Sequence, residues 1–290
     1  MTSYQAAQQA ARYAIVFGVA FSAAFMVDAA RGARAQGKLE ASYGVSLAGV
    51  PFGRGSWTID VRDGHYSASV RGSTVGLMRI FASGQGSSAA RGIIANGQPL
   101  AASYASSIQT DKKYDEVSMV LSGGSVKEFE AEPPSIPNPE RVPITDAHRR
   151  GVTDPMTAAI MRVPGNGDTF SPEACRRKLS IFDGRMRYDL SLAYKRLDKV
   201  KSEKGYQGTV VVCAVYFSPV AGHIPARPVI KYLIDLRDAE LWLAPIAGTR
   251  LMVPYRASVP TPFGVGVLQA TEFVTTPYPQ RASANGARSH

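Results

Sequence analysis

The chain has 290 residues and a formal net charge of +10, because 33 Lys and Arg outnumber 23 Asp and Glu. Such a surplus of cations favours anionic partners. The only two cysteines, Cys175 and Cys213, form no Cys-x-x-Cys pair, which disfavours a zinc site or a redox relay.

Residues 1–35 have the organisation of a signal peptide. Arg12 precedes an apolar run from Tyr13 to Val27, and Ala-Arg-Ala ending at Ala35 provides the small residues of a cleavage site before Gln36. The run is roughly 15 residues long, shorter than the ~20 of a spanning helix, so a membrane anchor is the weaker interpretation. We expect Sec-type export, cleavage after about Ala35, and a soluble periplasmic product without a stable membrane anchor.

Cleavage removes three arginines and one aspartate, so the formal net charge falls from +10 to +8. Outside the cytoplasm, this charge favours lipid headgroups, lipopolysaccharide or acidic wall polymers, and nucleic acid is not expected as a partner. The basic residues are scattered among acids, which is typical of solvated faces.

Alternation of apolar and polar residues predicts strands. It runs from Leu39 to Leu47 and from Trp57 to Val61. Similar segments occupy residues 66–70, 100–108, 117–121, 186–192, 210–216, 229–236, 241–243 and 251–253. Turn signals such as Asp63-Gly64 and Asn96-Gly97 separate them, so the pattern indicates an antiparallel meander.

Two segments interrupt the alternation. Residues 132–143 contain five prolines and cannot form a regular central strand or helix. Asp154-Pro155 is typical of a helix N-terminus, and apolar residues at helical spacing after it predict a helix over about residues 154–163. We expect a connector at 132–143 within a single β-rich domain of residues 36–275, with two domains as the alternative, and a disordered tail at 276–290.

The two cysteines are most simply a structural disulfide if the compartment is oxidising. The alternative is a catalytic thiolate at one of them, paired with His148 or His223.

Four runs resemble a known family: Tyr43 to Gly53, the Asp154-Pro155 pair, Cys175 followed by 182–189, and Cys213 followed by 219–223. They are similar to the bacterial domain of unknown function numbered 3108. The resemblance implies secretion, linkage of the two cysteines, and a β-rich fold that curls into an open barrel, and it supplies no catalytic residues. The expected fold is therefore mainly β, an antiparallel meander curled into an open barrel with one short helix.

No sequence motif identifies a reaction. Gly84 to Ala89 formally fits a dinucleotide-binding fingerprint, but no helix is expected after it, so a hairpin turn is the better interpretation. No nucleophile elbow, zincin motif or P-loop occurs. We therefore expect no enzymatic activity, no cofactor and no metal site.

The segment 183–189 is the densest polar cluster. If Arg185 and Arg187 share one strand face, they make a two-arginine contact for a phosphate or carboxylate. The alternative is a hairpin turn with an exposed ion pair.

Two functions fit these features. The first is a binding or carrier module for an apolar or anionic ligand of the envelope, such as a lipid or lipoprotein. The second is a structural or interaction protein that contacts another envelope protein through an exposed sheet edge or a basic face.

Overall fold

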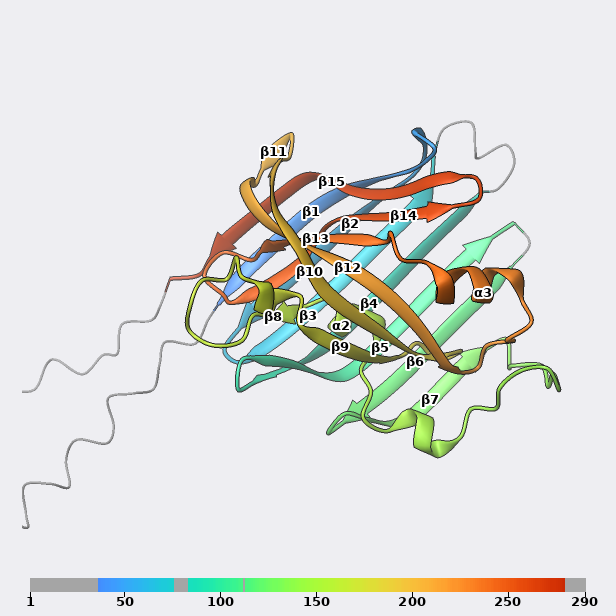
Figure 1. Cartoon of the computed structure of the whole chain (residues 1–290). Coiled ribbons are helices and arrows are strands. Elements are labelled where there is room, and N and C mark those ends of the chain that lie inside the picture. The colour runs from blue at the N-terminus through green and yellow to red at the C-terminus, as the bar shows by residue number, and fades with distance from the viewer. Residues whose placement is uncertain (1–35, 76–82, 112, 280–290) are drawn as a thin grey trace, which may run out of the picture. The chain divides into compact units, whose positions relative to one another are not determined.

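The computed structural model describes residues 36–75, 83–111 and 113–279, and in them the strands form one 15-stranded sheet (Figure 1). The first half holds β1 Gly37–Leu47, β2 Val50–Arg62, β3 His65–Thr74, β4 Gly84–Ala95, β5 Gln98–Thr110, β6 Tyr114–Ser122 and β7 Ser125–Glu132. The second half holds β8 Met161–Arg162, β9 Arg177–Phe182, β10 Arg187–Lys201, β11 Lys204–Gly205, β12 Gln207–Ala221, β13 Glu240–Pro245, β14 Leu251–Thr261 and β15 Gly264–Pro277. The prediction of a mainly β, antiparallel fold is confirmed.

The order of the strands explains why the sheet is a meander. β1 to β6 each pair antiparallel with the next strand, and the last strand, β15, pairs with β1. The full order is β7-β6-β5-β4-β3-β2-β1-β15-β14-β13-β12-β10-β9. Asp63 (φ 52°) and Gly64 (φ 79°) connect β2 to β3 in the left-handed conformation that tight hairpins require.

The sheet is open, with β7 and β9 as its edges, yet these edges approach each other. A short piece of chain bridges them: Arg150 pairs with Ser125 at the start of β7, and Thr153 pairs with Ile181 of β9. The fold is therefore β-barrel-like, with residues 150–153 lying between its two edge strands.

The main core lies on the inner face of this sheet and draws on both sides of the proline-rich segment. Val117 and Met119 of β6 belong to the same buried cluster as Val210 and Val212 of β12. Residues 132–143 thus do not separate two cores.

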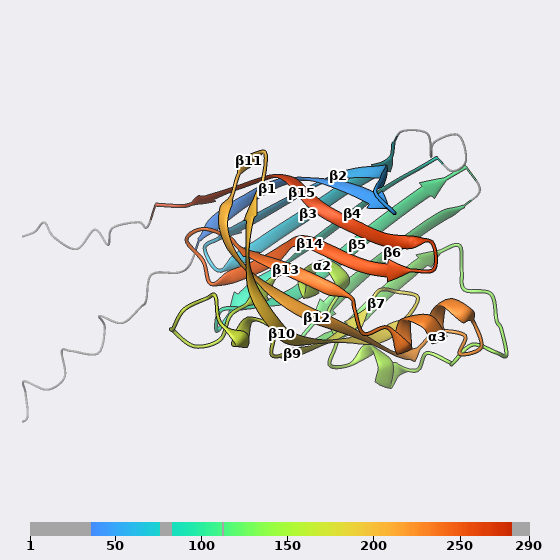
Figure 2. The same cartoon turned by 45° about the horizontal axis from the view of Figure 1, so that its top comes forward.

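The predicted helix at 154–163 is much shorter in the structure. α2 covers only Pro155–Ala158, and Met161 already belongs to β8, which pairs with β14. The Asp154 side chain caps α2 as predicted, by accepting a hydrogen bond from the Thr157 amide at 2.9 Å. α2 contacts β4 and β5 on one side and β9 on the other, so it lies inside the barrel (Figure 2).

The expectation of one helix and of a strand at 229–236 is wrong, because α3 spans Pro228–Asp235. Pro228 at the first helical position has the backbone angle that a helix needs, and Ile230 is the one residue of this helix that is buried. Along the described ranges, no helix is long and apolar enough to cross a membrane.

The predicted signal peptide, residues 1–35 with the cleavage residue Ala35, lies outside the described residues, and Gln36 is the first one inside. The predicted tail at 276–290 is wrong at its start, because Thr276 and Pro277 pair with Lys38 and Gly37 of β1. Residues 280–290 lie outside the described part.

Candidate functional site

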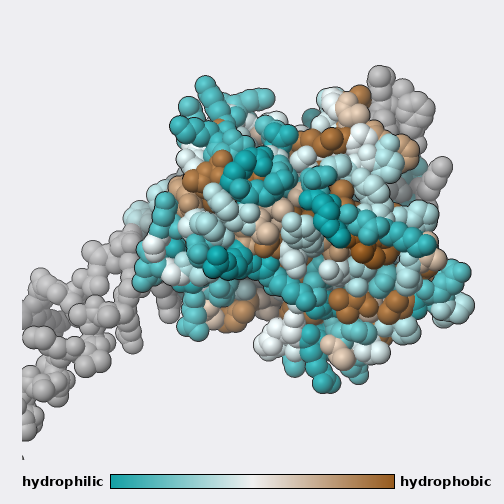
Figure 3. All heavy atoms as spheres, viewed as in Figure 1, coloured by the Kyte–Doolittle hydropathy of each residue, from teal (hydrophilic) through white to brown (hydrophobic). Residues whose placement is uncertain are grey.

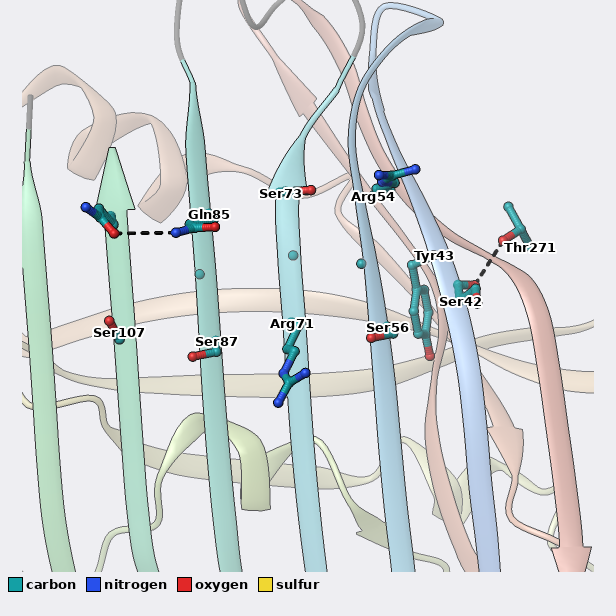
Figure 4. Close-up of a pocket in the computed structure, with 14 residues that line it drawn as sticks. Ser42, Tyr43, Arg54, Ser56, Arg71, Ser73, Gln85, Ser87, Ser107 and Thr271 are labelled. Atoms are coloured by element: carbon teal, nitrogen blue, oxygen red, sulfur yellow. Dashed lines mark hydrogen bonds between the residues drawn. The ribbon is translucent and has the colours of Figure 1, made fainter. Parts of the chain in front are cut away.

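A polar groove crosses the outer face of β1 to β5. On β2, Trp57, Ile59 and Val61 point into the core, so Arg54 and Ser56 point to the opposite, outer face. The groove occupies about 660 Å³ and its lining holds serines, glutamines and arginines (Figure 4).

One row of side chains forms the floor of the groove. Ser42, Ser56, Arg71, Ser87 and Ser107 lie on five neighbouring strands, and each is paired directly with the next. Paired residues point to the same face of a sheet, so the five side chains form a continuous row. At about 4.8 Å per strand, the row is roughly 19 Å long.

A second row lies beside the first, towards the turns. It holds Arg54, Ser73, Gln85 and Gln109, again in direct register. The Gln85 amide donates to the Gln109 carbonyl oxygen at 3.4 Å, as Figure 4 shows. The two rows together present hydroxyl and amide groups, which can both donate and accept hydrogen bonds.

Two exposed arginines stand in these rows. Arg54 is paired with Ser73, two residues along β3 from Arg71, so the arginines are diagonal neighbours. Among the described residues neither guanidinium has an ion pair or a side-chain hydrogen bond. In Figure 4 the Arg71 side chain lies between Ser56 and Ser87. Guanidinium groups bind phosphate and carboxylate oxygens through paired N–H donors.

Acidic residues stand at both ends of the floor row. Ser42 is paired with Glu272 of β15, and Ser107 with Glu116 of β6, which is itself paired with Glu132. Glu272 and Glu116 are each three strands from Arg71, or roughly 14 Å. The groove therefore has a cationic centre, and an acidic residue lies just beyond each of its two ends.

The predicted disulfide is confirmed. Cys175 and Cys213 are bonded, their Cα atoms are 5.5 Å apart, and both residues are fully buried. The bond ties the segment before β9 to β12 within a second, smaller apolar cluster. A catalytic thiolate at either position is thereby ruled out in this state, because both sulfurs are oxidised.

The predicted anion contact, Arg185 and Arg187, lies at the start of β10. Arg187 Nη1 donates to Asp189 Oδ1 at 2.6 Å, and Arg185 Nε lies 3.5 Å from Asp115 Oδ1. Burial alone would raise the pKa of Asp189, but hydrogen bonds from Lys178 and Arg187 outweigh it and lower that pKa. Each arginine thus has its own carboxylate partner. Anion binding here stays a prediction, in competition with these two acids.

The sequence alone does not distinguish Arg54 and Arg71 from the other basic residues. The pattern that could have indicated the groove is the set of polar residues that alternate with inward-facing ones along a strand. Examples are Arg54 and Ser56 before Trp57, and Ser69, Arg71 and Ser73. No group of three or more His, Cys, Asp or Glu is placed to hold a metal ion in the ranges that the structure describes.

These features define the class of the protein: an open, β-barrel-like antiparallel sheet with one disulfide. The chain matches the family described as "Protein of unknown function (DUF3108)" over residues 40–271, and it belongs to that family.

A comparison with solved structures gives a similar chain described as a "Beta-barrel-like Protein of Domain of Unknown Function DUF1849 from Brucella abortus". The two sequences are 9% identical, the TM-score is 0.48, and the match covers 84% of this chain and 98% of the other. No curated protein matches the chain.

Proposed function

We propose that this chain is an exported binding module of the cell envelope. Its ligand is an elongated, hydroxyl-rich molecule with one anionic group, of the kind that a sparsely phosphorylated or acidic glycan offers. The observation that carries the proposal is the pair Arg54 and Arg71, which have no acidic partner among the described residues and lie among serine and glutamine side chains. Export is supported by the disulfide, because such bonds persist in oxidising compartments.

The charge pattern selects the ligand. A densely charged polymer lying along the groove would meet Glu272 at one end and Glu116 at the other, and like charges repel. A single phosphate or carboxylate at the centre avoids both. The neutral arms of the ligand then hydrogen-bond to the serine hydroxyls and the glutamine amides.

As a site for a ligand, the outer groove is better supported than an apolar cavity inside the barrel. The inner face is occupied by α2 and by the packed core, including Trp57, Tyr66 and Phe182. The sheet edges offer less to a partner protein, since β7 carries Glu128, Glu130 and Glu132 and charged edge strands discourage pairing with another chain.

The proposal includes no catalytic step. The groove is lined by hydroxyl, amide and guanidinium groups, and its lining contains no His, Asp, Glu or Cys side chain that could act as a general base.

Binding can be tested by calorimetry with three probes of equal length: an oligosaccharide carrying one phosphate, its neutral counterpart and a densely sulfated heparin fragment. We expect the singly charged probe to bind best and the double variant Arg54→Gln/Arg71→Gln to lose that preference. Arg150→Gln removes an exposed cation elsewhere and serves as the control. Equal binding of the charged and neutral probes, or an unchanged double variant, contradicts the proposal.

A further inference from the structure

Two turns at one end of the sheet form an exposed apolar tip, which comprises residues 48–52 and 262–265. The turns lie together, because the Ala48 amide donates to the Val265 carbonyl oxygen at 3.0 Å. Three large apolar side chains project from the tip: Val50 is 56% exposed, Phe263 81% and Val265 43%. A cluster of exposed apolar side chains at loop tips is typical of an interaction surface.

The chain around this tip carries no charge. No charged residue lies between Glu40 and Arg54, or between Arg256 and Glu272, and these two stretches contain both turns. The charged residue closest to the tip along the chain is Arg54.

Two arginines, Arg54 and Arg256, lie on the strands that lead away from the tip. Arg54 is paired with Gly44, Gly44 with Gln269, and Gln269 with Arg256, so the two arginines lie at one level across the sheet. Val50 is roughly 13 Å of strand away from Arg54. The end of the tip is thus apolar, and basic residues lie further along the strands, away from the turns.

Helix α3 continues this surface. The Tyr232 hydroxyl donates to the Pro260 carbonyl oxygen at 3.0 Å, which holds α3 beside the base of the β14–β15 hairpin. Val229 on α3 is 58% exposed, and the exposed cations Arg227 and Lys231 flank it. Figure 3 shows hydrophobic residues on the side of the molecule where α3 and the β14–β15 turn lie.

We infer that the tip docks the protein on an anionic lipid surface. Phe263 and Val50 enter the interfacial region of the bilayer, where apolar side chains are removed from water. The exposed cations near them, Arg54, Arg227 and Lys231, then reach the headgroup level, where anionic lipids attract basic side chains. The absence of acidic residues from both turns removes the repulsion that such a surface would impose.

This docking goes beyond the proposed ligand binding, and the two can fail separately. Arg54 belongs to the groove as well as to the exposed cations near the tip, so the test relies on Phe263, which does not line the groove. Ile136 is a matched control, because it is 82% exposed and lies in the proline-rich segment.

The experiment uses the full chain with vesicles of phosphatidylcholine, with and without phosphatidylglycerol. We expect stronger binding to the anionic vesicles and about tenfold weaker binding for Phe263→Ser, while Ile136→Ser binds as the unmodified chain does. Brominated phospholipid should quench the added fluorescence of Phe263→Trp and leave that of Ile136→Trp unchanged.

Three results would overturn the inference. One is Phe263→Ser binding as tightly as Ile136→Ser, and another is unquenched fluorescence of Phe263→Trp. The third is a dimer, seen by sedimentation without vesicles, that Phe263→Ser dissociates, because the tip would then be a contact between copies of this chain.

Discussion

The rings of Phe129 and Phe182 lie 5.7 Å apart between centroids, although they belong to β7 and β9, the opposite edges of the sheet. The contact links the two edge strands on the inner face of the sheet, where Phe182 is fully buried.

Phe182→Ala should therefore lower the free energy of unfolding by about 3–5 kcal/mol, the usual cost of removing a buried phenyl ring. Phe263→Ala is the control, and because Phe263 is 81% exposed its change should stay within about 0.5 kcal/mol. Urea denaturation measures both. Equal costs for the two variants would mean that the edges do not depend on this ring.

The disulfide should contribute to stability through the loop that it closes. Cys175 and Cys213 are 38 residues apart, and the chain-entropy model assigns a loop of this size about 4 kcal/mol. We expect a reductant to lower the denaturation midpoint of the unmodified chain and to leave that of Cys175→Ala/Cys213→Ala unchanged. A reduced chain as stable as the oxidised one would refute this contribution.

The cap of α2 is part of a buried chain of hydrogen bonds. Asp154, fully buried, accepts hydrogen bonds from the Thr157 amide at 2.9 Å and from the Thr157 hydroxyl, and this hydroxyl lies 2.6 Å from the Tyr66 hydroxyl. Burial raises the pKa of the Asp154 carboxyl, so the charge itself is costly there.

Asp154→Ala should cost about 2 kcal/mol, because the helix loses its cap and a buried hydroxyl loses an acceptor. Asp154→Asn should cost less, since the amide oxygen still caps the helix without a buried charge. Thermal denaturation of the two variants gives the comparison, and a larger loss for the Asn variant would count against this account of the cap.

The ion pairs of Glu240 predict how the stability of the fold changes at acidic pH. Arg196 donates to it from both Nη atoms, at 2.8 and 3.1 Å, and Lys195 Nζ lies 2.6 Å away. The hydrogen bonds from Arg196, with those from Lys195, lower the pKa of Glu240 from 4.5 to about 2.

A lowered pKa means that the ionised carboxylate is the form that the fold stabilises. Its contribution is present above pH 4.5 and is lost as the pH falls to about 2. The free energy of unfolding of Glu240→Gln should therefore fall less steeply over this range than that of the unmodified chain. Glu140→Gln, at an exposed glutamate, should retain the normal slope.

The sequence predicted most of the strands for a clear reason. Leu39 to Leu47 alternates between the core and the outside, and the structure makes it β1. The sequence does not predict β4, because Gly84 to Ala89 is rich in Gly and Ser, a composition that favours a turn. Pairing with β3 and β5 makes this segment a strand.

The groove could not be predicted from one strand at a time. Ser42, Arg71 and Ser107 lie in one row only through the register of β1 to β5, and a shift of one residue in a pairing between them would place them on opposite faces. By contrast, Arg185 and Arg187 are only two residues apart in sequence, but each forms an ion pair with a different carboxylate, Asp115 for Arg185 and Asp189 for Arg187.

The most direct test of the central claim is the NMR signal of each arginine Nε–H group, assigned by Arg→Gln variants and followed as the singly phosphorylated oligosaccharide is added. The account predicts shifts at Arg54 and Arg71 and none at Arg187, whose guanidinium is held by Asp189. Shifts confined to Arg185 and Arg187, with Arg54 and Arg71 unmoved, would contradict it.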